Sequence, residues 1–231
     1  MTIALITGGN KGLGYETARR LIKIGHKVYI GARNAELGQK AADKLGAKFM
    51  LLDVTDEASV QAAKAQMNEL EGHLDVLVNN AGIAGEYLKA EEITADTMLH
   101  TFNTNVFGVV RVTQALLPLL RKSASPVIVH ISSGLGSFGM VTNPASIESK
   151  INSLNYTSSK AAVTMLAVQY AKGLPEMRVN AVDPGYTATD LNHHSGYQSV
   201  VEGTDAIVKM ATIGRDGPTG TFTNRFGAMP W

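Results

Sequence analysis

Short apolar runs alternate along the whole chain with longer segments of helical periodicity, and this alternation limits the folds open to the chain. The predicted strands are Ile3–Thr7, Lys27–Gly31, Ala47–Leu52, Asp75–Val78, Val127–Ile131, Arg178–Val182 and Gly220–Thr223. The predicted helices are Leu13–Ile24, Ala35–Leu45, Glu57–Leu70, Ala95–Leu120, Tyr156–Gly173 and Val200–Ala211. Strands without polar alternation are typical of a parallel sheet that helices cover on both faces. We therefore predict a doubly wound α/β fold of the Rossmann type with about seven strands, which binds ligands beyond the carboxyl ends of its strands.

Length, charge and cysteine content narrow the class of protein. The 231 residues suffice for a substantial core, and α/β folds of this length often form one domain, so 1–231 is expected to be a single domain. A net charge of +1 without runs of like charge does not indicate binding to nucleic acid or to an anionic membrane. The absence of cysteine excludes disulfides and thiolate metal sites, and it fits a reducing cytoplasm, where we expect the protein to act.

Neither a signal peptide nor a membrane span is expected. Residues Met1–Leu5 lead directly into an apolar segment without a basic region or a cleavage site. The most apolar long stretch, Val106–Leu120, is interrupted by two polar residues and a proline, which is typical of a core helix.

A glycine-rich loop joins the first predicted strand to the first predicted helix. Glycines permit a tight turn and a close approach of backbone to phosphate, and a helix N-terminus favours an anion. A glycine cluster alone is often only a turn, but here the strand–loop–helix context of a dinucleotide site is present. The residues assigned to the cofactor in this loop are Gly8, Asn10, Lys11, Gly12, Leu13 and Gly14.

The end of the second predicted strand favours NADPH over NADH. An acidic residue at this position typically binds the ribose 2′-hydroxyl of NAD, but the chain has Ala32 followed by Arg33. Arg33 suits a 2′-phosphate, and Lys11 in the glycine loop adds a second cation. Either base alone would fit solvated surface, whereas the two together, with no acid, indicate NADPH.

Further cofactor contacts are expected at the ends of the third and fourth strands. Asp53 and Val54 are placed to border the adenine, although Asp53 would equally serve as a helix N-cap. Small and amide residues close the fourth strand, where the cofactor must pass. The residues assigned there are Asn80, Ala81 and Gly82.

Tyr156 and Lys160 lie at positions i and i+4, which share one face of a helix. A nearby ammonium favours phenolate, so we expect Lys160 to lower the pKa of Tyr156 and to make it a general acid or base. The ordinary alternative is a surface pair with the lysine stem over the ring. Ser133 follows the fifth strand, and Asn105 lies within a predicted helix, where asparagine is unfavourable.

Motifs along essentially the whole chain resemble the short-chain dehydrogenase/reductase family. They occur in the order Thr7-Gly8-x-x-x-Gly12-x-Gly14, Asn79-Asn80-Ala81-Gly82, Asn105, Ser133, Tyr156-x-x-x-Lys160, Pro184-Gly185. Asn10, Lys11 and Arg33 look more like the NADPH-dependent carbonyl reductase branch than the NAD-dependent alcohol dehydrogenases. The resemblance implies reversible reduction of a ketone or aldehyde to an alcohol.

The resemblance also implies roles for individual residues. Tyr156 would give its proton to the carbonyl oxygen as hydride arrives from the nicotinamide, and Ser133 would hydrogen-bond the same oxygen. Lys160 would bind the nicotinamide ribose and lower the Tyr156 pKa. Asn105 would hold a water that links Lys160 to solvent.

The segment after the sixth strand resembles the family's nicotinamide-carboxamide loop. The residues assigned to the cofactor there are Pro184, Gly185, Thr187 and Thr189. Thr187 replaces a residue that is commonly aliphatic in the family, which leaves its side-chain role in doubt. The loop 186–197 is expected to close over the substrate.

The connection from Ser133 to Tyr156 is longer than in the compact family pattern, and residues 143–153 look inserted. Ala145–Ile151 is expected to form one or two helical turns. The insert shapes the pocket, obstructs a family-type dimer or tetramer, or is a neutral surface loop. The other expected pocket walls are Ala84–Tyr87 and Gly134–Met140, with apolar character from Phe138, Met140, Tyr186 and Tyr197.

Two other functions remain as alternatives. A reductase of carrier-linked 3-oxoacyl groups should need a basic entrance, and no such cluster is evident. A regulatory protein that senses NADP(H) would need no proton donor, so the retained Ser133, Tyr156 and Lys160 disfavour it. No metal site is expected, because the adjacent side chains of His193 and His194 do not converge.

Overall fold

Eight strands form one sheet in the order β3-β2-β1-β4-β5-β6-β7-β8. The computed structural model describes residues 1–231. The strands are β1 (Ile3–Thr7), β2 (Lys27–Ala32), β3 (Lys48–Leu51), β4 (Val76–Asn79), β5 (Val127–Ile131), β6 (Arg178–Val182), β7 (Phe222–Asn224) and β8 (Gly227–Ala228). The order reverses between β1 and β4, and in such sheets the crevice at this switch point is where ligands bind.

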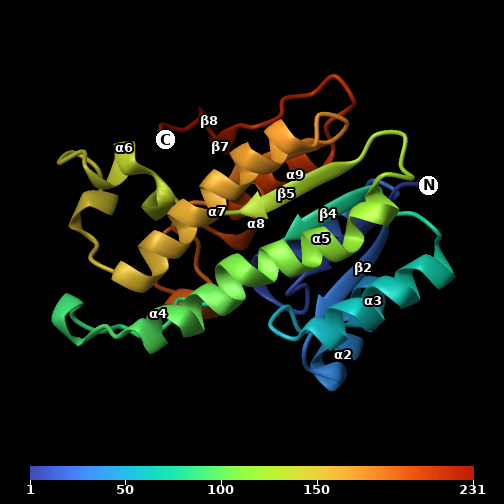
Figure 1. Ribbon diagram of the computed structural model, residues 1–231, viewed down its shortest axis with the longest axis horizontal. Helices are drawn as coiled ribbons and strands as arrows, with labels where there is room; N and C mark the ends of the chain where they lie inside the picture. Colours follow the sequence, from blue (N-terminus) through green and yellow to red (C-terminus); the bar gives the residue numbers. More distant parts are fainter.

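Helices cover both faces of the sheet (Figure 1). They are α1 (Gly12–Lys23), α2 (Ala35–Leu45), α3 (Glu57–Leu70), α4 (Ala95–Phe102), α5 (Gly108–Leu120), α6 (Phe138–Val141), α7 (Leu154–Gly173), α8 (Val200–Gly203) and α9 (Asp205–Ala211). Alternate residues of β1 serve the two cores: Ile3 and Leu5 pack with α3 and α5, whereas Ala4 and Ile6 pack with α1, α2 and α9. The predicted doubly wound sheet is thereby confirmed.

The sheet has one strand more than expected at its carboxyl-terminal end. The region of the last predicted strand, Gly220–Thr223, continues into a hairpin in which β8 runs antiparallel to β7, while every other neighbouring pair is parallel. Asn224 Oδ1 accepts from the Phe226 amide at 2.9 Å and stabilises the turn between them.

Two predicted helices are interrupted. A π-helical segment, Asn103–Phe107, separates α4 from α5, where one helix over Ala95–Leu120 was expected. The expected helix Val200–Ala211 divides into α8 and α9. Gly203, the last residue of α8, packs so closely on Thr187 that a Cβ there would clash with the threonine hydroxyl.

The inserted segment contains less helix than predicted. Only Glu148–Lys150 forms a single 3₁₀ turn, in place of one or two turns over Ala145–Ile151. The Asn143 side chain accepts from the Ala145 amide at 3.0 Å, an Asx turn that competes with helix. None of the helices combines the length and the apolar character needed to cross a membrane.

Candidate active site

A cavity of about 900 Å³ opens at the carboxyl ends of the strands. It brings together the glycine loop, the ends of β2 to β6 and the loop after β6. All but two of the predicted site residues line it, and the exceptions are Gly14 and Asn105. Gly14 instead lets α1 pack closely, because a Cβ there would lie 2.5 Å from both the Gly8 carbonyl oxygen and the side-chain Nδ2 of Asn80.

The glycine loop is shaped for a phosphate group. Gly8 and Gly12 have φ values of +63° and +54°, which favour glycine. No side chain caps the N-terminus of α1, so the first backbone amides of the helix remain available to an anion at the cavity. A pyrophosphate fits this cradle.

The loop after β4 is bonded to the glycine loop through side chains. Asn80 Nδ2 donates to the carbonyl oxygens of Thr7 and Gly8 at 2.8 and 3.1 Å. In return the Thr7 hydroxyl oxygen accepts from the amides of Asn80 and Ala81, each at 2.9 Å. The Asn80 side chain therefore shapes the site from behind, and Thr7, which was not predicted as a site residue, shares that task.

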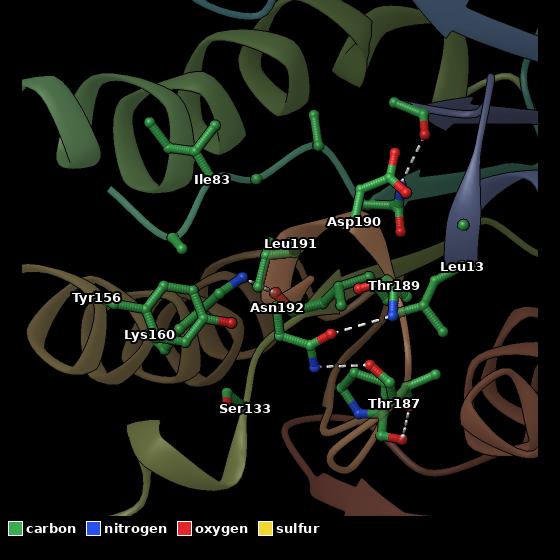
Figure 2. Close-up of a pocket in the computed structure, with 18 of the residues that line it drawn as sticks. Leu13, Ile83, Ser133, Tyr156, Lys160, Thr187, Thr189, Asp190, Leu191 and Asn192 are labelled. Carbon is green, nitrogen blue, oxygen red and sulfur yellow. Dashed lines mark hydrogen bonds between the residues drawn. The ribbon is translucent and has the colours of Figure 1, made fainter. Parts of the chain in front are cut away.

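Tyr156 and Lys160 lie side by side on α7, as Figure 2 shows. The Lys160 ammonium is 5.6 Å from the centre of the Tyr156 ring and donates to the Ile131 carbonyl oxygen at 2.8 Å. Ser133 lies at the carboxyl end of β5, and its hydroxyl oxygen accepts from the Leu135 amide at 3.2 Å. The phenol, the ammonium and the serine hydroxyl thus line one wall of the cavity.

The pKa of Tyr156 shifts in the direction opposite to the one expected from its lysine neighbour. Burial raises the Tyr156 pKa, the Asp183 carboxylate raises it further, and the Ser133 hydroxyl acts against both. Burial lowers the pKa of Lys160 to about 8, and Asp183 opposes that change. Tyr156 is therefore held in its protonated form, which is the form that a proton donor requires.

Asp183 is a site residue that sequence reasoning missed. It follows β6 directly, is only 6% exposed, and accepts from the Gly185 amide at 2.9 Å. Burial raises its pKa and the nearby Glu148 carboxylate adds to this rise, whereas the amides of Gly185 and Gly134 and the nearby Lys160 act against it. Its position at a strand end, next to the Pro184-Gly185 motif, was a usable signal.

Asn105 lies in the π-helical segment behind the cavity wall. Its side chain is 1% exposed, accepts from the Ile83 amide at 2.9 Å, and donates to the Ile83 carbonyl and the Ser159 hydroxyl at 2.9 and 3.0 Å. These bonds tie the loop after β4 to the residue that precedes Lys160. Its proposed water-holding role stays a prediction.

The structure contradicts the role of helix N-cap that was one of the two alternatives for Asp53. Asp56, not Asp53, caps α3, because Asp56 Oδ1 accepts from the Ala58 amide at 3.0 Å. Asp53 lines the cavity with Val54 and accepts from the Thr55 amide and hydroxyl at 2.9 and 2.7 Å. Although burial opposes it, these bonds lower the Asp53 pKa, with the nearby Arg33 assisting.

Most residues of the loop 186–197 line the cavity, and Figure 2 labels Thr187, Thr189 and Asn192 among them. Asn192 organises it, since its side chain donates to the Thr187 carbonyl at 2.9 Å and accepts from the Thr189 amide at 3.1 Å. The Thr187 hydroxyl donates to the Pro184 carbonyl at 3.1 Å, so this side chain is used within the loop. Asn192 had no signal in the sequence.

Lys11, which was predicted to serve as a second cation for a 2′-phosphate, binds a residue of this loop. Its ammonium forms an ion pair with Asp190 at 2.7 Å, and the His194 ring lies 3.0 Å from the same carboxylate. Arg33 is exposed and forms no ion pair. Of the two predicted cations, Arg33 is therefore the one without an ion-pair partner.

The aromatic character expected of the pocket is only partly present. Tyr186 lines the cavity, but Phe138, Met140 and Tyr197 do not. Phe138 is 72% exposed, and Met140 packs against the core around β7. Ile147, Glu148 and Ile151 from the inserted segment form that part of the wall instead.

Comparisons with known proteins agree with this geometry. Residues 2–199 match the family model described as short chain dehydrogenase. The chain is 32% identical to (-)-isopiperitenone reductase of Mentha piperita, with 98% of this chain and 97% of that protein covered. It is 31% identical to salutaridine reductase of Papaver bracteatum, covering 96% of this chain and 94% of that protein.

Among solved structures, the NADPH-bound carbonyl reductase from chicken fatty liver superposes with a TM-score of 0.88 at 28% identity and covers all of both chains. Family match, sequence identity and shared architecture agree over nearly the full length. The chain therefore belongs to the short-chain dehydrogenase/reductase family of nicotinamide-dependent oxidoreductases.

Proposed function

We propose that this protein uses NADPH to reduce a ketone or aldehyde to an alcohol, reversibly. The observation that carries the proposal is the placement of Ser133, Tyr156 and Lys160 on one wall of the cavity that also holds the glycine loop. A protonated phenol, a hydroxyl and a cation around one space suit a carbonyl oxygen that gains negative charge.

In this proposal each residue acts at a stated atom. The Tyr156 hydroxyl donates its proton to the carbonyl oxygen, and the Ser133 hydroxyl donates a hydrogen bond to the same oxygen. Lys160 binds the cofactor ribose, and its positive charge assists proton release from the phenol. Asn105 positions this group through its bonds to Ile83 and Ser159.

The proposed cofactor contacts extend along the floor of the cavity. The backbone of the glycine loop holds the pyrophosphate, Arg33 the 2′-phosphate, and Asp53 the adenine amine. The segment from Pro184 to Thr189 holds the nicotinamide carboxamide. When bound, the cofactor supplies the hydride. The NADPH-bound carbonyl reductase among the solved relatives supports the choice of NADPH.

A panel of ketones and aldehydes tests the proposal directly. Purified protein is mixed with NADPH or NADH, and consumption is followed by nicotinamide absorbance. We expect faster consumption of NADPH with at least some free ketones. Reduction of carrier-linked 3-oxoacyl groups alone would favour the first alternative function. Tight NADPH binding with no consumption across the panel would favour a sensor.

The pH profile of Asp183→Asn is a further expected result. Loss of this negative charge makes the Tyr156 phenolate less costly and the Lys160 ammonium less stable, so the pKa values of both groups fall. At alkaline pH less Tyr156 then retains its proton, and the alkaline limb of kcat for ketone reduction moves to lower pH. Asparagine can still accept from the Gly185 amide, so the loop is retained. An alkaline limb at the wild-type pH would contradict this coupling.

A further inference from the structure

One carboxylate in the cavity wall has no partner in the protein. The four carboxylate side chains that line the cavity are Asp53, Glu148, Asp183 and Asp190. Three of them have partners: Asp53 accepts from a threonine hydroxyl, Asp183 accepts from a backbone amide, and Asp190 forms an ion pair with a lysine. The Glu148 carboxylate makes neither a hydrogen bond nor an ion pair, although Glu148 is half-buried. Its hydrogen bonds are therefore made with water or with a molecule that enters the cavity.

Glu148 lies next to the reacting end of the cavity. Its Oε1 would be only 2.9 Å from a Cβ built on Gly134, the residue after Ser133. The carboxylate therefore rests against the backbone that carries the serine hydroxyl. Ile147 and Ile151 of the same segment also line the cavity.

None of the cations that line the cavity forms an ion pair with Glu148. Lys11 is paired with Asp190, Arg33 is at the end of β2, and Lys160 donates to the Ile131 carbonyl. Around the substrate end the cavity offers Tyr87 and Tyr186, whose rings attract positive charge. A neutral apolar substrate would displace water from the Glu148 carboxylate and leave it unpaired, which is unfavourable. A cationic group on the substrate removes that penalty.

We propose that Glu148 binds a protonated amine of the substrate, so that this protein is specific for amino ketones or amino aldehydes. The inference rests on the proposed carbonyl reduction and assigns a substrate class to the same cavity. It also gives the inserted segment a function, because Glu148 lies within residues 143–153. The amine forms a charge-assisted hydrogen bond with the carboxylate while the carbonyl faces Tyr156 and Ser133.

Matched ketones test this assignment. N-methyl-4-piperidone and 4-methylcyclohexanone have nearly the same shape, but only the first carries a protonated amine at neutral pH. With saturating NADPH we expect the wild-type kcat/KM to be about tenfold higher for the piperidone, as one charged hydrogen bond allows. Glu148→Gln keeps the size of the side chain and should bring the ratio close to one. Lys150→Gln, on the same turn but outside the cavity lining, should keep the wild-type ratio.

The outcomes separate this inference from the proposed function. Reduction of both ketones with no preference, or a preference that Glu148→Gln leaves intact, would overturn the amine assignment and leave carbonyl reduction standing. If neither these ketones nor the panel consume NADPH, the proposed function fails. In that case, calorimetric binding of N-methylpiperidine to the NADPH-loaded protein decides: weaker binding to Glu148→Gln supports the assignment, and equal or absent binding refutes it.

Discussion

Tyr156→Phe is expected to lower kcat for ketone reduction about a thousandfold. A general acid typically accelerates a proton-transfer step by roughly a hundredfold to ten-thousandfold. Phenylalanine fills the same space beside Lys160 but has no proton to donate to the carbonyl oxygen. The glycine loop and Arg33 are untouched, so the Kd for NADPH should stay near the wild-type value. Turnover is measured by nicotinamide absorbance, and cofactor binding by calorimetry.

Tyr170→Phe is the matched control for this experiment. Tyr170 lies further along α7 and outside the cavity lining, so the same change of atoms should leave kcat nearly unaltered. Ketone reduction by Tyr156→Phe at a rate near that of Tyr170→Phe would remove Tyr156 from the proton-donor role. A joint loss of NADPH binding and turnover would indicate a structural defect instead.

Elements whose signals are local could be predicted from the sequence. The helices Ala35–Leu45 and Glu57–Leu70 have the predicted bounds, because Asn34 and Asp56 cap them through the amides of the following turn. The predicted bounds of β1 and β5 are also those of the structure, since each strand is an apolar run with a single polar residue. Such signals lie within a few residues of the element that they determine.

Elements that depend on distant contacts could not be predicted in this way. The π-helical segment between α4 and α5 contains Asn105. The Asn105 side chain forms hydrogen bonds with Ile83 and Ser159, which belong to other parts of the chain. The residue at the break between α8 and α9 is Thr204, whose hydroxyl oxygen accepts from the Arg20 guanidinium of α1 at 2.9 Å. Helical periodicity continues through both places and does not report these contacts.

The membership of the site was more predictable than its electrostatics. Because parallel strands present their carboxyl ends at one edge of the sheet, Ser133, Arg33 and Asp53 were predicted to lie at one site. All three line the cavity. The predicted direction of the Tyr156 pKa shift was wrong. The sequence shows Lys160 four residues away, but it does not show the burial of the phenol. The negative charge of Asp183, the residue after β6, also raises the Tyr156 pKa, and the spacing of residues along a helix cannot predict this contact.

Arg33→Asp is expected to reduce the preference for NADPH over NADH about a hundredfold, since it removes a charged hydrogen bond to the 2′-phosphate and adds a repulsive charge. The aspartate can also accept from a ribose 2′-hydroxyl, so the kcat/KM with NADH should rise in absolute terms. Steady-state kinetics with each cofactor and one common ketone measure the ratio. Lys40→Asp places the same charge change on exposed surface of α2, and it should leave the ratio unchanged.

The ion pair between Lys11 and Asp190 makes the Arg33 experiment discriminating. A lysine already bound to a carboxylate must break that contact to reach a phosphate, whereas Arg33 has no ion pair to break. Lys11→Met should therefore change the NADPH preference less than Arg33→Asp does. If Lys11→Met abolishes the preference and Arg33→Asp preserves it, the 2′-phosphate lies at the glycine loop, and its assignment to the end of β2 is wrong.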